Sequence, residues 1–361
     1  MKKTASYILA FALGAASLAS CQQQNISLPV DFNVTLDGDN VYRTGEIVRF
    51  RFSGDADYIT FYSGETGHEW DKRERTSIPT DEIKNLALDM KIQPLWGRGG
   101  GNETWDYGFR IYLSKDFKGL ESEDGYEQRA QIKKMVEDGE FPLTAADTTK
   151  AWRQIWNDVD CESVLNEWKY GLSKDIIDYA DNFCIAFHWH PWTYNLTANQ
   201  RSYHVQGDIT MEYGKGEQKL TAFTEVPFTV VTMNEQDEPN LGQNPKLRTK
   251  EDGSQTRMGT INFGQPNWDI NFEGAASSDL TYELDAWCIS DPMSLNAVSK
   301  DSGVQIKSLL SPILTYEHTY TKPGTYKAVF YGVNDNYQGR TTALKEVTVI
   351  VVDDEPFADA K

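Results

Sequence analysis

Apolar and polar residues alternate along most of this chain, which is the pattern of half-buried β-strands. The first clear run has Val48, Phe50 and Phe52 on one face and ends in a turn at 53–55. A second short run follows, with Ile59 on its apolar face. Short strands separated by turns at this spacing predict a mostly β protein that begins with an immunoglobulin-like sandwich.

The middle of the chain shows the same alternation. One strand is expected to carry Phe183, Ile185, Phe187 and Trp189 on one face and Cys184, Ala186, His188 and His190 on the other. Further strands are expected within 85–113, 202–213 and 218–232, and a glycine-rich loop at 97–101 interrupts the first of these segments. Short antiparallel strands of this kind predict a central sandwich that resembles a jelly roll.

Two segments inside this region have helical rather than strand periodicity. Residues 126–138 predict a charged surface helix. A second helical face is formed by Trp152, Ile155, Trp156 and Val159. Their spacing predicts an amphipathic helix whose tryptophans face a core. We therefore expect a helical insertion over 118–170.

The last third of the chain returns to alternation and predicts a third sandwich. Tyr316, His318 and Tyr320 share one strand face, a tight turn follows at 322–324, and 347–351 predicts a buried strand. The expected organisation is a signal segment at 1–20, a tether at 21–27, an immunoglobulin-like domain at 28–95, a jelly-roll-like domain at 96–240, a C-terminal immunoglobulin-like domain at 241–353 and a tail at 354–361.

The amino-terminal residues have the pattern of a secretion signal. Lys2 and Lys3 precede the apolar stretch 8–13, and small residues lead to Cys21. This apolar stretch is too short to cross a bilayer, which needs about 20 apolar residues. Leu18-Ala19-Ser20-Cys21 resembles a bacterial lipobox, so we expect Cys21 to carry a lipid that anchors the chain to the outer membrane, facing outward.

The charge of the chain limits its partners. The formal net charge is −19, and removal of Lys2 and Lys3 with the signal makes it more negative by two. Such a surface repels phosphate backbones, which argues against nucleic acid, and it also disfavours acidic polysaccharides. Neutral ligands remain as candidates.

The four cysteines do not form a recognisable framework. With Cys21 assigned to the lipid, Cys161, Cys184 and Cys288 remain, and no CxxC pair is present. One disulfide with one free thiol and three unpaired buried thiols both remain open.

Several segments resemble a known family. Gly45-Glu46-Ile47-Val48-Arg49-Phe50, Phe52-Ser53-Gly54-Asp55-Ala56-Asp57 and Phe61-Tyr62-Ser63-Gly64-Glu65 resemble the opening of a Bacteroidota lipoprotein family with the domain of unknown function 5017. Lys322-Pro323-Gly324-Thr325-Tyr326 resembles the final strands of a polycystic-kidney-disease-type (PKD-like) domain. The resemblance implies a cell-surface protein beside a glycan-import system, and it brings no catalytic residues with it.

Aromatic side chains are the first candidates for a ligand site. The chain holds 10 Trp and 18 Tyr, and flat aromatic rings stack on the apolar faces of neutral sugars. Most such rings belong to cores, and Trp189 is expected there because it shares the apolar strand face. Four rings beside the glycine loop or after Pro191 are the expected ligand face: Trp96, Trp105, Trp192 and Tyr194. Trp70 is a weaker candidate.

Histidines are the second candidates. His188 and His190 are two apart on a strand and point to one face, and His204 on the following strand completes a three-imidazole metal set. The alternative is a pair of partly exposed strand histidines, and no HExxH spacing is present. We treat the metal site as the weaker interpretation.

Carboxylates give no distinct catalytic signal. Among 54 acidic residues, Glu65, Asp106 and Asp269 each qualify for a glycosidase pair, and none stands out. Calcium would suit Asp181, Asp208 and Glu212, but EF-hand spacing is missing. No GxSxG motif occurs, and Cys184 lies in an apolar run typical of an inert thiol. We expect neither an enzyme nor a bound cofactor.

These observations lead to one expected function and one alternative. The first is non-catalytic binding of a neutral oligosaccharide or polysaccharide at the cell surface, in partnership with an outer-membrane transporter complex. The alternative is a surface adhesin or assembly protein that binds another protein. A glycan-active hydrolase is a third, weaker interpretation.

Overall fold

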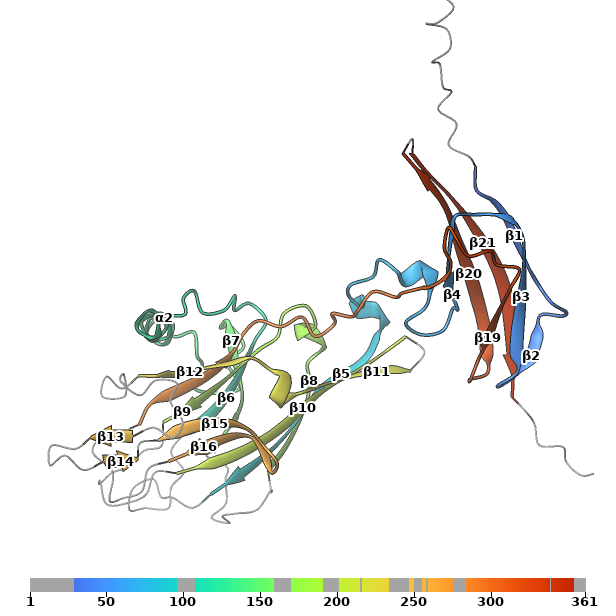
Figure 1. The fold of residues 1–361 in the computed structure, drawn as a ribbon. Helices are drawn as coiled ribbons and strands as arrows, with labels where there is room; N and C mark the ends of the chain where they lie inside the picture. The colour runs from blue at the N-terminus through green and yellow to red at the C-terminus, as the bar shows by residue number, and fades with distance from the viewer. Residues whose placement is uncertain are drawn as a thin grey trace, which may run out of the picture. The chain divides into compact units, whose positions relative to one another are not determined.

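The computed structural model describes residues 29–95, 108–158, 170–190, 201–214, 216–233, 247–249, 255–257, 259–274, 284–337 and 339–353. They fold mostly as β-strands, and α2 (Gly125–Glu137) is the one α-helix among them (Figure 1). The chain forms two compact units. We call Met1–Thr76 with Ser299–Lys361 the split unit, and Ser77–Val298 the inserted unit. No helix in the described ranges is long and apolar enough to cross a membrane.

The split unit is a β-sandwich of two sheets. Its three-stranded sheet has the order β1 (Asp31–Leu36), β3 (Ile47–Asp55), β19 (Thr315–Thr319). Its five-stranded sheet has the order β18 (Val304–Lys307), β4 (Tyr58–Tyr62), β20 (Gly324–Asn336), β21 (Gly339–Val352), β2 (Val41–Arg43). Phe50, Phe61 and Phe330 meet in the core between them, as the alternation of the sequence predicts. The 3₁₀ turn η2 (Trp70–Lys72) belongs to this unit.

The expected domain boundaries differ from these units. The segments 28–95 and 241–353 were expected to form separate sandwiches, but β19 pairs with β3, β20 pairs with β4, and β2 runs parallel to β21. Strands from both ends of the chain therefore share the same sheets. Local alternation predicts where a strand lies but not its partner, because pairing between segments far apart in sequence leaves no local pattern.

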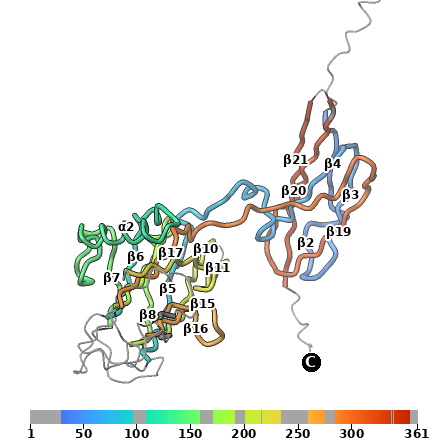
Figure 2. The backbone as a smooth tube through the Cα atoms, turned by 60° about the vertical axis from the view of Figure 1, so that its left-hand side comes forward, coloured from blue at the N-terminus to red at the C-terminus, as the bar shows by residue number. Residues whose placement is uncertain are grey.

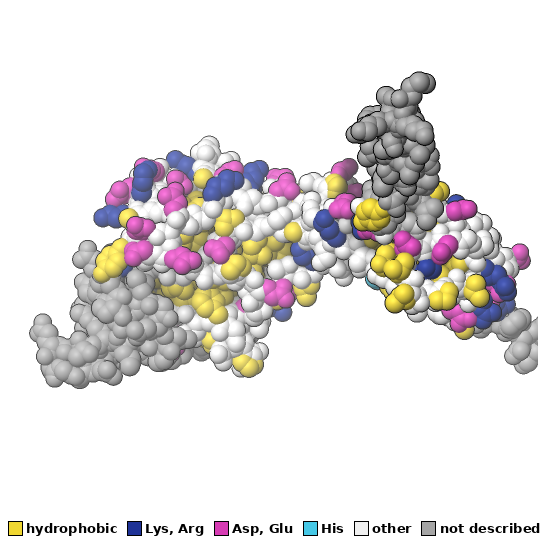
Figure 3. All heavy atoms as spheres, turned by 45° about the horizontal axis from the view of Figure 1, so that its top comes forward, with side chains coloured by type: hydrophobic (Ala, Val, Ile, Leu, Met, Phe, Trp, Pro, Cys, Tyr) yellow, Lys and Arg dark blue, Asp and Glu magenta, His cyan; other side chains and the backbone are white. Residues whose placement is uncertain are grey.

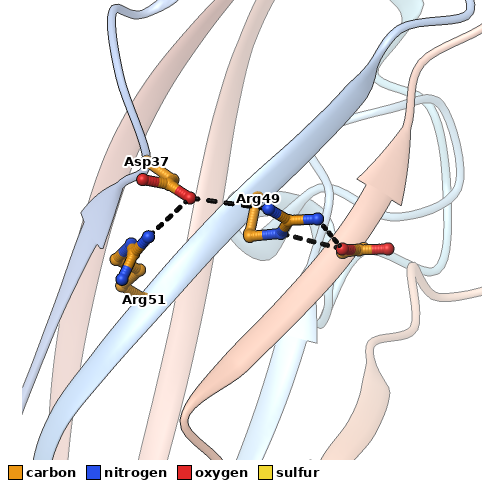
Figure 4. A network of polar contacts seen from close by, with 4 residues as sticks. Asp37, Arg49 and Arg51 are labelled. Atoms are coloured by element: carbon orange, nitrogen blue, oxygen red, sulfur yellow. Dashed lines mark hydrogen bonds and ion pairs between the residues drawn. The ribbon is translucent and has the colours of Figure 1, made fainter.

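Charged side chains lie on the outer surfaces of both units. On the face drawn in Figure 3, acidic and basic side chains are interspersed. In the split unit, the Asp37 carboxylate accepts a hydrogen bond from Arg51 Nη2 at 2.8 Å, and Arg49 bonds Glu317 on the neighbouring strand (Figure 4). Arg51 holds the pKa of Asp37 below its ordinary value. These pairs are exposed, so they contribute little to stability.

The inserted unit is a sandwich of a six-stranded and a five-stranded sheet. The first has the order β15 (Thr260–Gln265), β16 (Trp268–Glu273), β10 (Tyr203–Tyr213), β5 (Ile83–Pro94), β8 (Tyr170–Asp175), and β11 (Glu217–Ala222) also pairs with β10. The second has the order β12 (Phe228–Thr232), β17 (Ala286–Ser290), β9 (Cys184–Trp189), β6 (Phe109–Ser114), β7 (Trp152–Asn157). A hairpin of β13 (Leu247–Thr249) and β14 (Gln255–Arg257) and the 3₁₀ turns η3 (Thr80–Glu82), η5 (Ile177–Tyr179) and η6 (Phe223–Glu225) complete it.

The five-stranded sheet is buried on both faces. The β9 side chains of Phe183, Ile185, Phe187 and Trp189 enter the core between the two sheets, as predicted. Cys184 and Ala186 point to the opposite face and enter a second core with Ile132 and Met135 of α2. Figure 2 shows α2 on the side of β6 and β7. The six-stranded sheet therefore presents the polar face of the inserted unit.

The described residues 147–158 do not form the predicted amphipathic helix, and Val159 lies outside the described residues. Residues 152–157 form β7, which pairs with β6 through a β-bulge between Ile111 and Tyr112. The bulge breaks the two-residue alternation, so Trp152 faces the second core while both Ile155 and Trp156 pack against the first. This spacing imitates a helical face. The charged helix predicted at 126–138 is confirmed as α2, whose first turn is capped by Asp124.

The two described cysteines of the inserted unit are free and buried. Cys184 faces the second core and Cys288 faces the core between the sheets, so a bond between these two is excluded. Burial raises the pKa of Cys184 to about 12, and it raises that of Cys288 as well. Both are inert structural thiols at neutral pH. Cys161 and Cys21 lie outside the described residues.

Candidate functional site

The outer face of the six-stranded sheet, which we call the open face, carries a row of polar side chains. Along β10, Tyr203, Val205 and Ile209 point into the core. The alternate positions His204, Gln206 and Asp208 therefore point outward. Their cross-strand partners Gln93, Lys91 and Asp89 on β5 do the same. Strand alternation thus places six polar side chains side by side on one surface.

One aromatic ring joins this polar row. The indole of Trp268, at the start of β16, stacks on the imidazole of His204 with ring centroids 5.5 Å apart and planes 24° apart. Nδ1 of His204 lies 3.0 Å from Oε1 of Gln93, which fixes the imidazole from the other side. Burial lowers the pKa of His204, so the ring is neutral at pH 7. Trp268 therefore lies on a rigid, uncharged support.

A hollow of about 530 Å³ lies on the open face, between β8, β5, β10 and the start of β16. Its charged and polar lining includes Asp89, Lys91, Ser173, Gln206, Asp208 and Asp269. Gly171 of β8 contributes no side chain, and a Cβ built there meets nothing within 4 Å. Nε2 of Gln206 donates to the carbonyl of Asn267 at 3.1 Å, which connects the hollow to the turn before Trp268.

Asp269 also has a structural role in this hollow. One side of β10 pairs with β16 over residues 203–205 and with β11 over 208–213. Between these two ladders, the Gly207 N–H donates to Asp269 Oδ2 at 2.8 Å. The pKa of Asp269 is raised, mainly by burial and further by the negative charge of Asp208, although the hydrogen bond from the Gly207 N–H acts to lower it. The carboxylate is thus held in place at the cost of partial desolvation.

Two amides extend the polar row to the edge of the sheet. Asn262 on β15 is opposite Asn271 on β16, which is opposite His204. Each of these asparagines is 8% exposed, and the Oδ1 atom of each is buried without a hydrogen-bond partner. Buried acceptors of this kind are uncommon in folded proteins. This end of the open face therefore carries two amide oxygens that make no hydrogen bond within the fold.

A separate group of titratable residues, which we call the His–Asp cluster, lies on the five-stranded sheet. It consists of His188, His190 and Asp285, whose ligand atoms all lie within 4.8 Å of one another. Nε2 of His188 lies 2.9 Å from Oδ1 of Asp285. Burial lowers the pKa of His188 more than Asp285 raises it. Burial is the largest single effect on Asp285 and acts to raise its pKa, but His188, His190 and Arg110 together outweigh it, so the pKa of Asp285 is lowered.

The three-imidazole set predicted from the sequence is wrong in its third member. His204 lies on β10 in the six-stranded sheet, whereas His188 lies on β9 in the five-stranded sheet. The strand that follows β9 in sequence crosses to the other sheet instead of pairing beside it. Asp285, almost a hundred residues after His188, takes the third place.

Other predicted site residues have the following positions. Trp96, Trp105, Trp192, Tyr194 and Asp106 lie outside the described residues. Trp189 is fully buried, as predicted, and its Nε1 donates to the Arg201 carbonyl at 3.0 Å. Trp70 packs on Tyr62 and Tyr331 with the Arg73 guanidinium over its ring, and Glu65 bonds His318. Among the described carboxylates predicted as glycosidase or calcium candidates, only Glu65 lies in the split unit. The inserted unit holds Asp181, Asp208, Glu212 and Asp269, and it brings Asp208 and Asp269 together in the lining of the hollow.

The first part of the chain has a recognisable relationship. Residues 20–134 match the family described as Domain of unknown function (DUF5017). This confirms the predicted resemblance to the domain of unknown function 5017, whereas the Bacteroidota lipoprotein and PKD-like parts stay predictions. No curated protein matches the chain in sequence.

The DUF5017 match crosses the boundary between the two units. It covers β1 to β4 of the split unit and then β5, β6 and most of α2 in the inserted unit. It includes Asp89, Lys91 and Gln93 of the open face and ends before β10 and β16, which supply His204 and Trp268. The description of the family assigns no function.

Trp268 and Asp285 were not predicted as site residues from the sequence. Trp268 follows a turn and begins an alternating run, so its strand was detectable from the sequence. Its contact with His204 was not, because that contact depends on the pairing of β16 with β10. The outward row of His204, Gln206 and Asp208 was visible as alternation within 202–213. Asp285 had no local signal, because only the pairing of β17 with β9 brings it to His190.

Proposed function

We propose that this protein binds a neutral oligosaccharide or polysaccharide on the open face, without catalysis, for an outer-membrane uptake system. In this proposal, lipid on Cys21 anchors the chain to the outer membrane, facing outward, and residues 22–27 act as its tether. The observation that supports this proposal most is the stack of Trp268 on His204, because Asp269 and Gln206, which lie near them along the same strands, line the hollow on the open face.

A supported indole is a good platform for a sugar. The apolar C–H face of a pyranose ring packs on an aromatic ring, and burying that face gains free energy through the hydrophobic effect. Trp268 is half-buried, and His204 holds one side of its ring. A rigid platform loses little conformational entropy on binding, so more of the contact energy contributes to affinity.

The hollow beside this platform offers hydrogen bonds for sugar hydroxyls. Asp89 and Asp208 provide acceptors, Lys91 provides a donor, and the Ser173 hydroxyl provides both. The hollow contains three aspartates and one lysine among its lining residues, so its charge favours neutral over anionic ligands. A volume of about 530 Å³ lies within the range of small-molecule sites.

One observation favours protein binding as a second function. In the split unit, Leu309, Leu310 and Leu314 between β18 and β19 are 59%, 91% and 78% exposed. Exposed leucines gathered in one loop suit a contact with another protein. The adhesin or assembly role would use this loop and leave the open face unoccupied.

The test is a panel of neutral and acidic polysaccharides, run by affinity electrophoresis with the purified chain. The proposal predicts that at least one neutral glycan slows the protein, that acidic glycans do not, and that 1 M NaCl leaves the retardation in place because stacking is not ionic. Lack of retardation by every neutral glycan would refute it. Release of shorter sugars from a retained glycan would show that the protein is a hydrolase instead.

A further inference from the structure

The backbone alone brings the three side chains of the His–Asp cluster together. His188 and His190 are two apart at the end of β9, so they point to the same face. The antiparallel pairs Trp287–His188 and Ala286–Trp189 place Asp285 directly across from His190. The N–H of His190 donates to the Gly108 carbonyl and the carbonyl of Asp285 accepts from the Met233 N–H, each at 2.8 Å, so both backbones are anchored.

The imidazole of His188 is fixed by two rings. It stacks on the buried indole of Trp287 with centroids 4.2 Å apart and planes 13° apart. The imidazoles of His188 and His190 are also stacked, with ring centroids 6.0 Å apart and planes 25° apart. A ligand that already points at the site loses little freedom when an ion binds.

The spacing fits a small divalent cation. Two ligand atoms at about 2.0–2.1 Å from zinc in tetrahedral geometry lie about 3.3 Å from each other. The His188 Nε2 to Asp285 Oδ1 distance is 2.9 Å, and all the ligand atoms of the cluster lie within 4.8 Å. To reach the geometry of zinc, the His188–Asp285 distance would lengthen by about 0.4 Å, and the other separations, which are at most 4.8 Å, would shorten by up to about 1.5 Å.

We propose that His188, His190 and Asp285 form a binding site for one divalent transition-metal ion, zinc above all. Zinc and its first-row neighbours accept a set of two imidazole nitrogens and one carboxylate oxygen, whereas calcium and magnesium prefer all-oxygen sets. Side-chain exposures of 13% for His188 and 34% for Asp285 leave one side accessible, so a fourth position is open to water or a ligand.

Charges around the cluster set the conditions of binding. Imidazole and carboxylate ligands both bind a metal through an unprotonated atom, so binding of an ion would replace the contact between His188 Nε2 and Asp285 Oδ1. Arg110 of β6 is the cross-strand partner of His188, and its positive charge acts against the binding of a cation. A second arginine, Arg129 of α2, donates a hydrogen bond to the carbonyl of Thr232 nearby.

The bound ion would join β9 to β17. His188 lies in β9, His190 directly after it and Asp285 directly before β17, so the metal would connect the end of β9 to the start of β17. A ligand that binds only the folded state raises its stability. Zinc is therefore expected to raise the melting temperature of the inserted unit.

The experiment measures zinc binding to the purified chain by isothermal titration after dialysis against a chelator. The expected result is one equivalent of Zn²⁺, with affinity reduced at least about tenfold by Asp285→Asn and by His190→Gln. His204→Gln is the matched control, since it removes an imidazole from the other sheet, and it should bind zinc as the wild type does. Ca²⁺ should give no comparable signal.

Melting curves of the same four proteins keep the result interpretable. Each variant should melt near the metal-free wild type, which shows that it folds, and added zinc should raise the melting temperature of the wild type and His204→Gln alone. Wild-type protein without a zinc equivalent would overturn the proposal. So would a folded Asp285→Asn variant that binds zinc as tightly as the wild type.

Discussion

The indole of Trp268 lies nearly parallel to the imidazole of His204, 5.5 Å away between ring centroids. The two residues are far apart in sequence and meet because β16 and β10 are neighbours in the six-stranded sheet. Gln93 on the next strand holds the imidazole, so three strands contribute to one small platform. A sheet face with such a platform and a hollow beside it suits the capture of a sugar chain.

Trp268→Ala removes the platform and is expected to weaken retention by the bound neutral glycan at least about tenfold, because a well-packed aromatic anchor contributes 1.4 kcal/mol or more. Affinity electrophoresis over a series of glycan concentrations measures the change. Tyr126→Ala is the control: Tyr126 lies on α2, is 63% exposed, and should leave retention unchanged. Equal losses in both variants would contradict a specific platform.

Asp269→Asn is expected to raise the melting temperature at pH 7. The pKa of Asp269 is raised in the folded state above its ordinary value of 3.8, so its ionisation disfavours folding at any pH above the folded-state pKa. Asparagine keeps an oxygen for the Gly207 N–H and carries no charge. The gain should shrink as the pH falls toward 3.8 and vanish below it, where aspartate is protonated in both states.

Melting curves of wild type and Asp269→Asn at a series of pH values provide this measurement. A variant less stable than wild type at pH 7 would mean that the bond to Gly207 outweighs desolvation.

Two fully buried tryptophans of the inserted unit differ in one hydrogen bond. Nε1 of Trp189 donates to the Arg201 carbonyl at 3.0 Å, whereas Nε1 of Trp152 is buried without a partner. Trp189→Phe should therefore lower the unfolding free energy by about 1–3 kcal/mol more than Trp152→Phe does. Urea denaturation of the two variants measures the difference, and equal losses would refute the assigned role of the Trp189 bond.

The inserted unit should fold without the rest of the chain. Its two ends meet, because Ser77 bridges to Ala297 and the Ile78 N–H donates to the Asn296 carbonyl at 2.9 Å. A protein of residues 77–298 is expected to melt in one cooperative transition, followed by circular dichroism. The split unit, with Thr76 joined to Ser299 by a short glycine–serine linker, should do the same. Failure of both to melt cooperatively would mean that the units depend on each other.

Strand positions could be predicted well, because burial on one face leaves a two-residue pattern. The alternation around Phe50, within 183–189 and at 347–351 matches β3, β9 and β21. Partners could not be predicted, since β20 pairs with β4 across more than 250 residues. The β-bulge in β7 shows another limit: its extra residue, Ile155, gives a strand at 152–157 the spacing of a helical face.

The candidate site was predictable only in part. The two-residue spacing of His188 and His190 correctly places both imidazoles on one face. The third member depended on which strand lies beside β9, and β17 brings Asp285 there instead of His204. The platform likewise depended on the pairing of β10 with β16. Site geometry built across strands needs the sheet order, which the sequence does not display.

The most direct test of glycan capture on the open face fills its hollow. Gly171 faces the hollow from β8, its φ is not in the left-handed region, and a Cβ there has nothing within 4 Å. Gly171→Leu should therefore fold normally and occupy the space of the sugar, while Gly171→Ala leaves most of it free. For a neutral glycan that retards the wild type, the account predicts at least about a tenfold loss of affinity for Gly171→Leu and a small loss for Gly171→Ala. Unchanged affinity in a folded Gly171→Leu variant would contradict it.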